Sequence, residues 1–127
     1  MASVPSIRGA RAIGRVEFLH TIARAGDSLE YAVVNTGERP LRFGAGYALE
    51  RRDSGRWQLM NADQAFHAWA RHLAPGERVQ LTARLPAGLP AGSYRVRKRL
   101  SVVLPDRPGV GEPLQAIAEL TIEPSGN

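Results

Sequence analysis

The chain has 127 residues, a net charge of +5 and no cysteine. This length fits one domain of ordinary size, and the absence of cysteine excludes disulfides and thiolate metal sites. Sixteen of the seventeen basic residues are arginine; proteins that bind nucleic acid through charge usually mix arginine with lysine, so we do not expect a nucleic-acid partner. No apolar run approaches the roughly 20 residues of a membrane span.

Residues 1–14 combine serine, proline, glycine and arginine without periodicity, and we expect them to form a flexible leader before one domain at 15–124. From residue 15 onward, segments in which every second residue is apolar alternate with turn sequences, a pattern typical of an antiparallel sandwich or barrel. About seven strands in a chain of this size indicate an all-β, immunoglobulin-like β-sandwich. The predicted strands are at 15–22, 29–34, 41–52, 56–60, 77–85, 93–104 and 116–123.

The alternation also predicts which side chains face the core. In each predicted strand, the apolar residues of one face point between the two sheets. Lys98 falls on an inward position, and we expect its side chain to extend toward the edge of the core. The predicted core residues are Val16, Phe18, Leu29, Tyr31, Val33, Tyr47, Leu49, Leu59, Val79, Leu81, Tyr94, Val96, Leu100, Leu120 and Ile122.

The segment 61–73 breaks the alternation. Phe66, Trp69 and Leu73 recur at the spacing of one helical face, and Asn61 followed three residues later by glutamine resembles a capping box. We therefore predict a short helix or an irregular crossover near 61–73, which ends at the Pro-Gly turn that follows. Phe66 and Trp69 either complete the core, which is the simpler interpretation, or border an apolar groove that contacts a partner protein or a carbohydrate.

A stripe of arginines is the most distinctive feature of the sequence. Arg95, Arg97 and Arg99 alternate on the predicted solvent face of one strand, and Arg51 and Arg52 belong to a neighbouring hairpin. These five residues are a possible binding face for an anion or polyanion. The face is predicted to carry no aromatic side chain for base stacking, which weighs against nucleic acid. The simpler interpretation pairs the arginines with carboxylates on adjacent strands. The candidates are Glu50, Glu119 and Glu123.

Three short patterns occur in a fixed order along the chain. The first is N-x-x-x-x-x-x-x-x-G-x-x-Y-x-L-E-x-x-x-x-G-x-W from Asn35 to Trp57, the second is P-G-E at 75–77, and the third is G-S-Y-R at 92–95. Their order and spacing resemble a family of bacterial immunoglobulin-like domains. The resemblance covers residues 16–123 and implies a β-sandwich, no catalytic residues and, commonly, an extracytoplasmic location beside other modules. The arginine-punctuated N-terminus has no signal-peptide core, so the sequence leaves the location open.

Several residues of these patterns have structural roles in our interpretation. Gly92 precedes Tyr94 at the start of a strand, where the phenol can reach back to an upstream backbone carbonyl as a tyrosine corner. Pro75 fixes one backbone angle and Gly76 frees the next, which is turn chemistry. Trp57 is expected to cap the core after its hairpin, and it is also a possible apolar contact for a partner.

The sequence contains no recognisable catalytic or metal-binding constellation. His20, His67 and His72 lack the spacing of a shared metal site, and no serine lies in a nucleophile-elbow sequence. We therefore assign no catalytic residue, no metal and no cofactor. The predicted function is a non-enzymatic structural or interaction module that contacts another protein, whose identity and oligomeric state the sequence does not indicate. The alternatives are a glycan- or polyanion-binding module and an unrecognised hydrolase or enzyme subunit.

Overall fold

The computed structural model describes residues 14–104 and 107–124; the leader predicted for 1–14 lies outside them, except for Gly14. The described residues form strands, turns and irregular segments but no helix, which confirms the predicted all-β class. None of them therefore forms a helix long and apolar enough to cross a membrane. The strands are β1 (Gly14–Phe18), β2 (Ile22–Arg24), β3 (Ser28–Asn35), β4 (Leu41–Gly44), β5 (Ala48–Asp53), β6 (Arg56–Leu59), β7 (Ala70–Leu73), β8 (Arg78–Arg84), β9 (Gly92–Leu104) and β10 (Arg107–Glu123).

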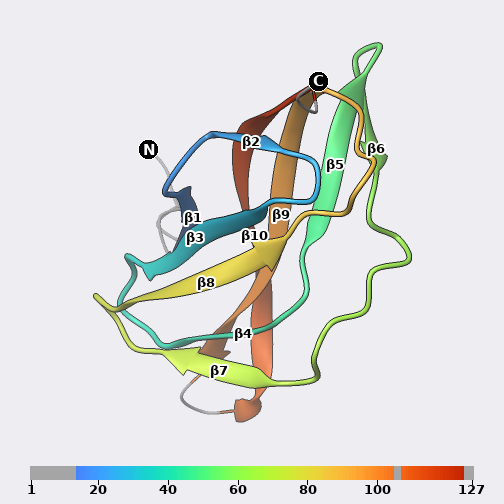
Figure 1. Cartoon of the computed structure of the whole chain (residues 1–127). Coiled ribbons are helices and arrows are strands. Elements are labelled where there is room, and N and C mark those ends of the chain that lie inside the picture. Colours follow the sequence, from blue (N-terminus) through green and yellow to red (C-terminus); the bar gives the residue numbers. More distant parts are fainter. Residues whose placement is uncertain (1–13, 105–106, 125–127) are drawn as a thin grey trace.

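The strands form two sheets that pack against each other as a sandwich. The smaller sheet has the order β1-β3-β8; the larger follows β2-β10-β9-β4-β7, with β5 also paired to β9 and β6 paired to β5. Figure 1 shows β3 and β8 crossing in front of the long strands β9 and β10. Two of the predicted strands are interrupted, because 15–22 divides into β1 and β2 and 41–52 divides into β4 and β5.

The core between the sheets consists mainly of the alternate side chains predicted from the sequence. Val33, Leu49 and Leu100 are fully buried. Leu59 contradicts the prediction, because it is 48% exposed. It lies opposite Glu50 in the ladder between β5 and β6, and paired residues share a face, so Leu59 projects from the outer side with Glu50. The predicted core residues that are partly buried and pack against the core are Phe18, Tyr47, Val79 and Leu81.

The crossover at 60–69 is irregular, so the predicted helix is wrong and the irregular alternative is confirmed. The chain then continues into β7, where Leu73 pairs with Leu41 of β4 and is buried. Asn61 and Gln64 close a turn through a backbone hydrogen bond of 3.1 Å, instead of a capping box. A helix of about a dozen residues is marginal in isolation, whereas pairing with β4 satisfies the backbone and buries Leu73.

The long strand β9 changes partner along one of its edges. β10 pairs with its other edge over most of its length. On the first edge, β5 pairs with the strand as far as Arg97, and β4 pairs at Ser101 and Val102. Residues 98–100 have no strand partner on this edge within the described part of the chain.

Lys98 fills the resulting gap from the core side. Its side chain is fully buried, and Nζ donates hydrogen bonds to the carbonyl oxygens of Gly44 at the end of β4 (2.6 Å) and Gly46 in the β4–β5 connection (2.9 Å). The predicted inward orientation of Lys98 is confirmed, but its predicted extension to the edge of the core is wrong. Burial lowers the pKa of Lys98 to about 8. These two backbone carbonyls supply the acceptors that an enclosed ammonium needs.

Candidate functional site

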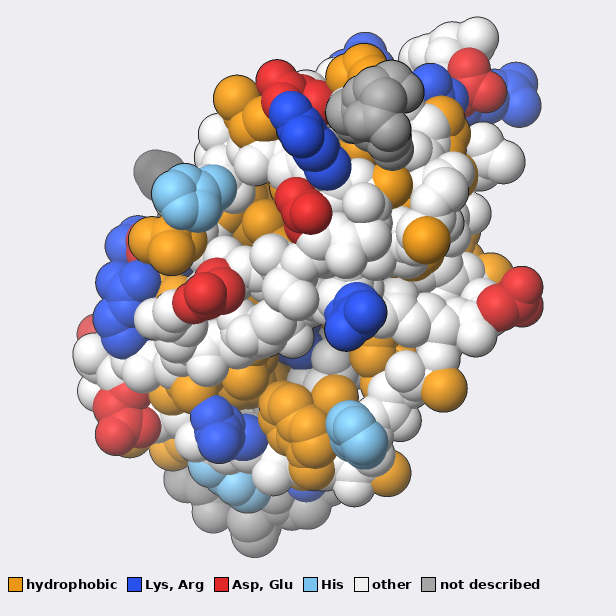
Figure 2. Space-filling model, in the orientation of Figure 1, with side chains coloured by type: hydrophobic (Ala, Val, Ile, Leu, Met, Phe, Trp, Pro, Cys, Tyr) orange, Lys and Arg blue, Asp and Glu red, His pale blue; other side chains and the backbone are white. Residues whose placement is uncertain are grey.

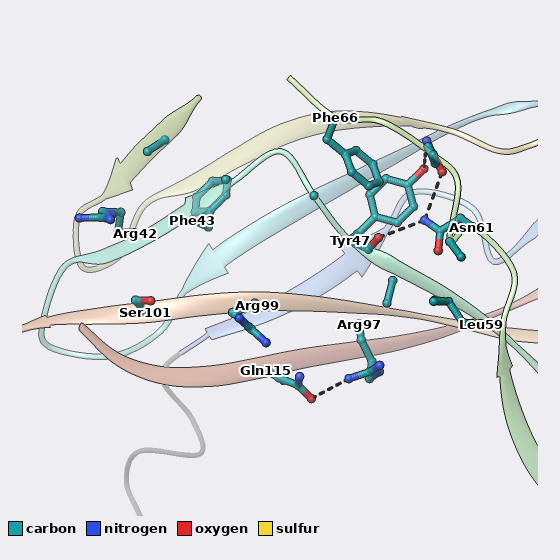
Figure 3. A pocket seen from close by; sticks show the side chains of 16 residues that line it. Arg42, Phe43, Tyr47, Leu59, Asn61, Phe66, Arg97, Arg99, Ser101 and Gln115 are labelled. Atoms are coloured by element: carbon teal, nitrogen blue, oxygen red, sulfur yellow. Dashed lines mark hydrogen bonds between the residues drawn. The ribbon is translucent and has the colours of Figure 1, made fainter. Parts of the chain in front are cut away.

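The outer face of the larger sheet contains a cleft where β9 passes from β5 to β4, and we name it the β4–β5 cleft. Its volume is about 650 Å³. Outward side chains of β9 and β10 form the floor, and residues of β4, β5 and the crossover form the walls (Figure 3). The lining includes Arg42, Phe66, Arg97, Arg99, Ser101 and Gln115.

The floor follows from the alternation in β9. Arg97, Arg99 and Ser101 are two residues apart, so all three project from the outer face. Gln115 of β10 lies opposite Arg99 in the ladder, and Arg42 of β4 lies opposite Ser101. Arg42 is therefore a diagonal neighbour of Arg99, at the spacing of about 7–8 Å that is usual for such pairs. Both residues line the cleft.

Aromatic side chains form one wall. Phe66 packs edge-on against Tyr47, with the ring centres 4.9 Å apart (Figure 3), and 37% of Phe66 remains exposed. The Tyr47 hydroxyl donates a hydrogen bond to the Arg84 carbonyl (3.1 Å) and accepts one from the Gln64 amide (3.0 Å). Burial raises the pKa of Tyr47, so the phenol stays protonated and the wall is held in place at neutral pH.

Asn61 attaches the crossover to β5. Its Oδ1 accepts a hydrogen bond from the Leu49 amide (2.9 Å), and its Nδ2 donates to the Tyr47 carbonyl (3.0 Å) and to the Gln64 side chain (3.1 Å) (Figure 3). The buried side-chain amide thus takes the place of a strand residue beside β5. The local sequence pattern at Asn61 predicts a helix cap and carries no signal for a bond to a strand twelve residues earlier.

Glu50 is shared by two arginines of the stripe. Its buried carboxylate accepts hydrogen bonds from Arg95 Nε (2.6 Å) and from Arg97 Nε and Nη2 (2.9 and 2.8 Å). The bonds from Arg97 and Arg95 hold the pKa of Glu50 below its ordinary value in spite of burial. Trp57 packs on Arg95, whose guanidinium carbon lies 4.2 Å from the ring centre. The prediction that this face carries no aromatic side chain is therefore wrong.

Arg99 and Arg42 have different surroundings from Arg95 and Arg97. Both are exposed, and neither forms an ion pair with an acidic side chain that the structure describes. Arg42 and Gln115 line the cleft, but no pattern in the sequence marks them as site residues. The alternation around residue 42 places its side chain on an outer face, but only the pairing of β4 with β9 places it near Arg99.

Arg51 and Arg52 do not line the cleft, although the sequence groups them with the stripe. Arg51 turns to the end of the sheet, where Nη2 and Nε donate to the Ala91 carbonyl (2.9 and 3.3 Å). A Cβ added to Gly92 would lie 3.1 Å from Arg51 Nε, and Gly92 has a φ of +150°, so this position favours glycine. Arg52 lies on the hairpin of β5 and β6, 6.0 Å from the centre of the Trp57 ring.

Trp69 is not among the residues that line the cleft. It packs edge-on against Phe43 with ring centres 6.0 Å apart, and 38% of it is exposed. Together with Phe66, it borders a smaller hollow of about 220 Å³ between the crossover and β8. Figure 2 shows hydrophobic side chains gathered in the lower part of this face, beside basic side chains and a histidine. The two aromatic residues thus partly cover the core and partly face solvent.

The residues assigned structural roles lie at the ends of strands. The Tyr94 ring is fully buried, and its hydroxyl donates a hydrogen bond to the carbonyl of Pro90, four residues upstream. The turn at 74–77, with Pro75 and Gly76 at its centre, is closed by a hydrogen bond of 3.0 Å between its end residues. Gly76 has a φ of +83°, as the third position of a type II turn requires.

The described residues include no group of three or more histidine, cysteine, aspartate or glutamate side chains that could hold a metal ion. His20 follows β1, His67 lies in the crossover and His72 belongs to β7. The charged side chains of the cleft lining are arginines, which stay protonated in proteins. Such groups bind and orient anions but do not exchange protons, so the arrangement suits recognition of a ligand.

The chain is similar to several solved structures. The structure of E. coli alpha-2-macroglobulin matches with a TM-score of 0.52 and 18% identity, over 97% of this chain and 7% of that chain. A PapD-like domain of human CEP192 matches with a TM-score of 0.47 and 14% identity, over 88% of this chain and 87% of that chain. The putative ApaA protein from Bordetella pertussis matches with a TM-score of 0.43 and 20% identity, over 85% of this chain and 87% of that chain.

No curated protein sequence matches the chain. The family described as bacterial Ig-like domain matches residues 19–115, which is most of the sandwich and includes the floor and walls of the β4–β5 cleft. The resemblance inferred from the three sequence patterns is thereby confirmed, and the chain belongs to the family of bacterial Ig-like domains.

Proposed function

We propose that this protein is a non-enzymatic interaction module that binds a partner protein in the β4–β5 cleft. The observation that carries the proposal is the combination, in one cleft on a sheet, of exposed guanidinium groups with an exposed aromatic ring. Arg99 and Arg42 border the floor, and Phe66 stands on the wall. Arginine and aromatic residues are the types most enriched at the centres of protein interfaces.

Hydrogen bonds within the chain hold the wall and the floor of the cleft, which favours binding. The bonds of Tyr47, Asn61 and Gln64 hold the wall, and the strand ladders hold the floor. Little conformational freedom is then lost on association, so more of the contact energy contributes to affinity. Membership of the Ig-like family supports a non-catalytic role. We also infer an extracytoplasmic location, which is common for such domains.

Site-specific photo-cross-linking tests this function. A photoreactive amino acid replaces Leu59, which lines the cleft and is 48% exposed, or, as the control, Leu19, which is 65% exposed after β1. In extracts of the source bacterium, we expect a protein cross-linked from position 59 and not from position 19. The purified partner should then bind Phe66→Ala at least about tenfold more weakly than wild type, and Leu19→Ala normally. Equal cross-linking from both positions, or normal binding by Phe66→Ala, would contradict the proposal.

A further inference from the structure

The charge distribution in the β4–β5 cleft indicates what kind of ligand it suits. Arg95 and Arg97 share the one carboxylate of Glu50, so these three side chains together are positively charged. Arg99 and Arg42 add two guanidinium groups that have no ion-pair partner among the described side chains. The cleft therefore has an excess of positive charge at its floor, and a ligand with negative charge complements it.

The geometry around Arg99 favours a carboxylate. A guanidinium presents parallel N–H groups that match the two oxygens of a carboxylate. Arg97 already uses its N–H groups in this way on Glu50 and also reaches Gln115 (3.4 Å). Arg99, opposite Gln115 in the ladder and two residues before Ser101, has the same fork on the same face. A carboxylate of a partner can therefore bind to Arg99 as Glu50 binds to Arg97.

The shape of the basic surface favours a peptide over a polyanion. A nucleic acid or a sulfated glycan needs a continuous basic track along its backbone. Here the stripe is interrupted, because Arg95 is covered by Trp57 and bound to Glu50, and Arg51 is turned away onto a backbone carbonyl. The aromatic wall at Phe66 lies beside the basic floor, and it suits an apolar side chain next to an acidic one.

We infer that the β4–β5 cleft recognises an acidic segment of its partner protein, in which a carboxylate side chain binds Arg99, with Arg42 beside it, and an adjacent apolar side chain packs on Phe66. This inference rests on the proposed function and specifies the chemistry of the partner. Arg99 is the principal contact, because it occupies the floor and is not engaged by Glu50.

A displayed library of random peptides, selected on the immobilised wild-type protein, tests this inference. Enriched peptides are then measured by fluorescence anisotropy with three variants: Arg99→Gln, Phe66→Ala and the control Arg78→Gln. Arg78 is a similarly exposed arginine on β8 of the opposite sheet. Heparin and a single-stranded DNA serve as polyanion probes in the same buffer, and thermal midpoints verify that each variant is folded.

We expect the enriched peptides to be acidic, to bind Arg99→Gln and Phe66→Ala at least about tenfold more weakly than wild type, and to bind Arg78→Gln normally. Neutral or basic peptides that need Phe66 but not Arg99 would overturn the carboxylate inference and leave the proposed function intact. Equal losses of peptide affinity in Arg99→Gln and Arg78→Gln would overturn the carboxylate inference, because they would show unspecific attraction to positive charge. Heparin or DNA binding that depends on Arg99 more strongly than peptide binding would overturn the choice of a peptide. A selection without any peptide that depends on Phe66 would contradict both proposals.

Discussion

The two halves of β9 carry the same kind of side chain in different environments. In the first half, beside β5, Arg95 and Arg97 are bound by Glu50, and their side chains are only 22% and 29% exposed. In the second half, where β5 has ended and β4 begins, Arg99 is exposed in the cleft and Lys98 is enclosed in the core. The difference shows that an outward arginine of this strand becomes structural where β5 supplies Glu50 and stays available for binding where neither β5 nor β4 pairs with it.

The largest effect is expected when the carboxylate that Arg95 and Arg97 share in the first half of β9 is removed. Glu50→Ala leaves the partly buried Arg95 and Arg97 without a counter-charge, and we expect a loss of about 2–3 kcal/mol in the free energy of unfolding, measured with urea. Partial exposure of both arginines keeps the loss below that of a fully buried pair. The matched control is Glu119→Ala, which removes an exposed carboxylate opposite Arg95 and should change stability by less than about 0.5 kcal/mol.

The pH dependence of the same variant sharpens this test. Because its arginine partners lower the pKa of Glu50 from 4.5, the folded state binds a proton there less readily than the unfolded state. The stabilisation is therefore present above pH 4.5 and is lost as the pH falls through the folded-state pKa. The difference in the free energy of unfolding between wild type and Glu50→Ala should become smaller as the pH falls below 4.5. A difference that stays constant there would mean that the lost energy comes from packing.

Lys98, the enclosed cation in the second half of β9, should make stability depend on pH in a different range and for a different reason. Burial lowers the pKa of Lys98 from 10.5 to about 8, so between these values the unfolded state binds more protons than the folded state. The free energy of unfolding should therefore rise with pH in this window, by up to about 3 kcal/mol, since one pKa unit corresponds to about 1.4 kcal/mol. The rise should be absent from Lys98→Met, in which the tyrosines titrate as in wild type. An equal rise in both proteins would contradict the assignment.

The start of β9 offers a smaller effect. Tyr94→Phe keeps the buried ring but removes the hydroxyl that bonds to the Pro90 carbonyl, and we expect a loss of about 1 kcal/mol in the free energy of unfolding. Tyr31→Phe is the control, because its buried hydroxyl has no hydrogen-bond partner among the described residues. If the two variants lose the same stability, the bond to Pro90 contributes nothing specific.

The smallest effect on stability is expected in the cleft itself. Arg99→Gln removes an exposed guanidinium that forms no ion pair with a described side chain. The free energy of unfolding, derived from the thermal midpoint, should therefore change by less than about 0.5 kcal/mol. The same substitution in the first half, Arg97→Gln, breaks two bonds to Glu50 and should cost clearly more. Equal costs would show that the two halves of β9 do not differ as the structure indicates.

The sequence by itself determines most of the strands and the faces of most of their side chains. Alternation in β9 predicts that Lys98 points inward and that Arg97 and Arg99 point outward, because successive residues of an extended chain project to opposite sides. The same pattern predicts most of the core. The Tyr94 position follows from local chemistry, since a glycine precedes a tyrosine at the start of a strand. These features depend on neighbouring residues in the chain, so a short window contains them.

The tertiary structure alone decides which elements become neighbours. The proximity of Arg42 to Arg99, the packing of Trp57 on Arg95 and the outer position of Leu59 all follow from strand pairing. The segment 61–73 has a helical spacing of apolar residues, but its last four residues become β7, because the edge of β4 satisfies their backbone. Pairings of this kind join segments far apart in the chain, and they are selected by the burial and hydrogen bonding of the whole sandwich, which no local pattern records.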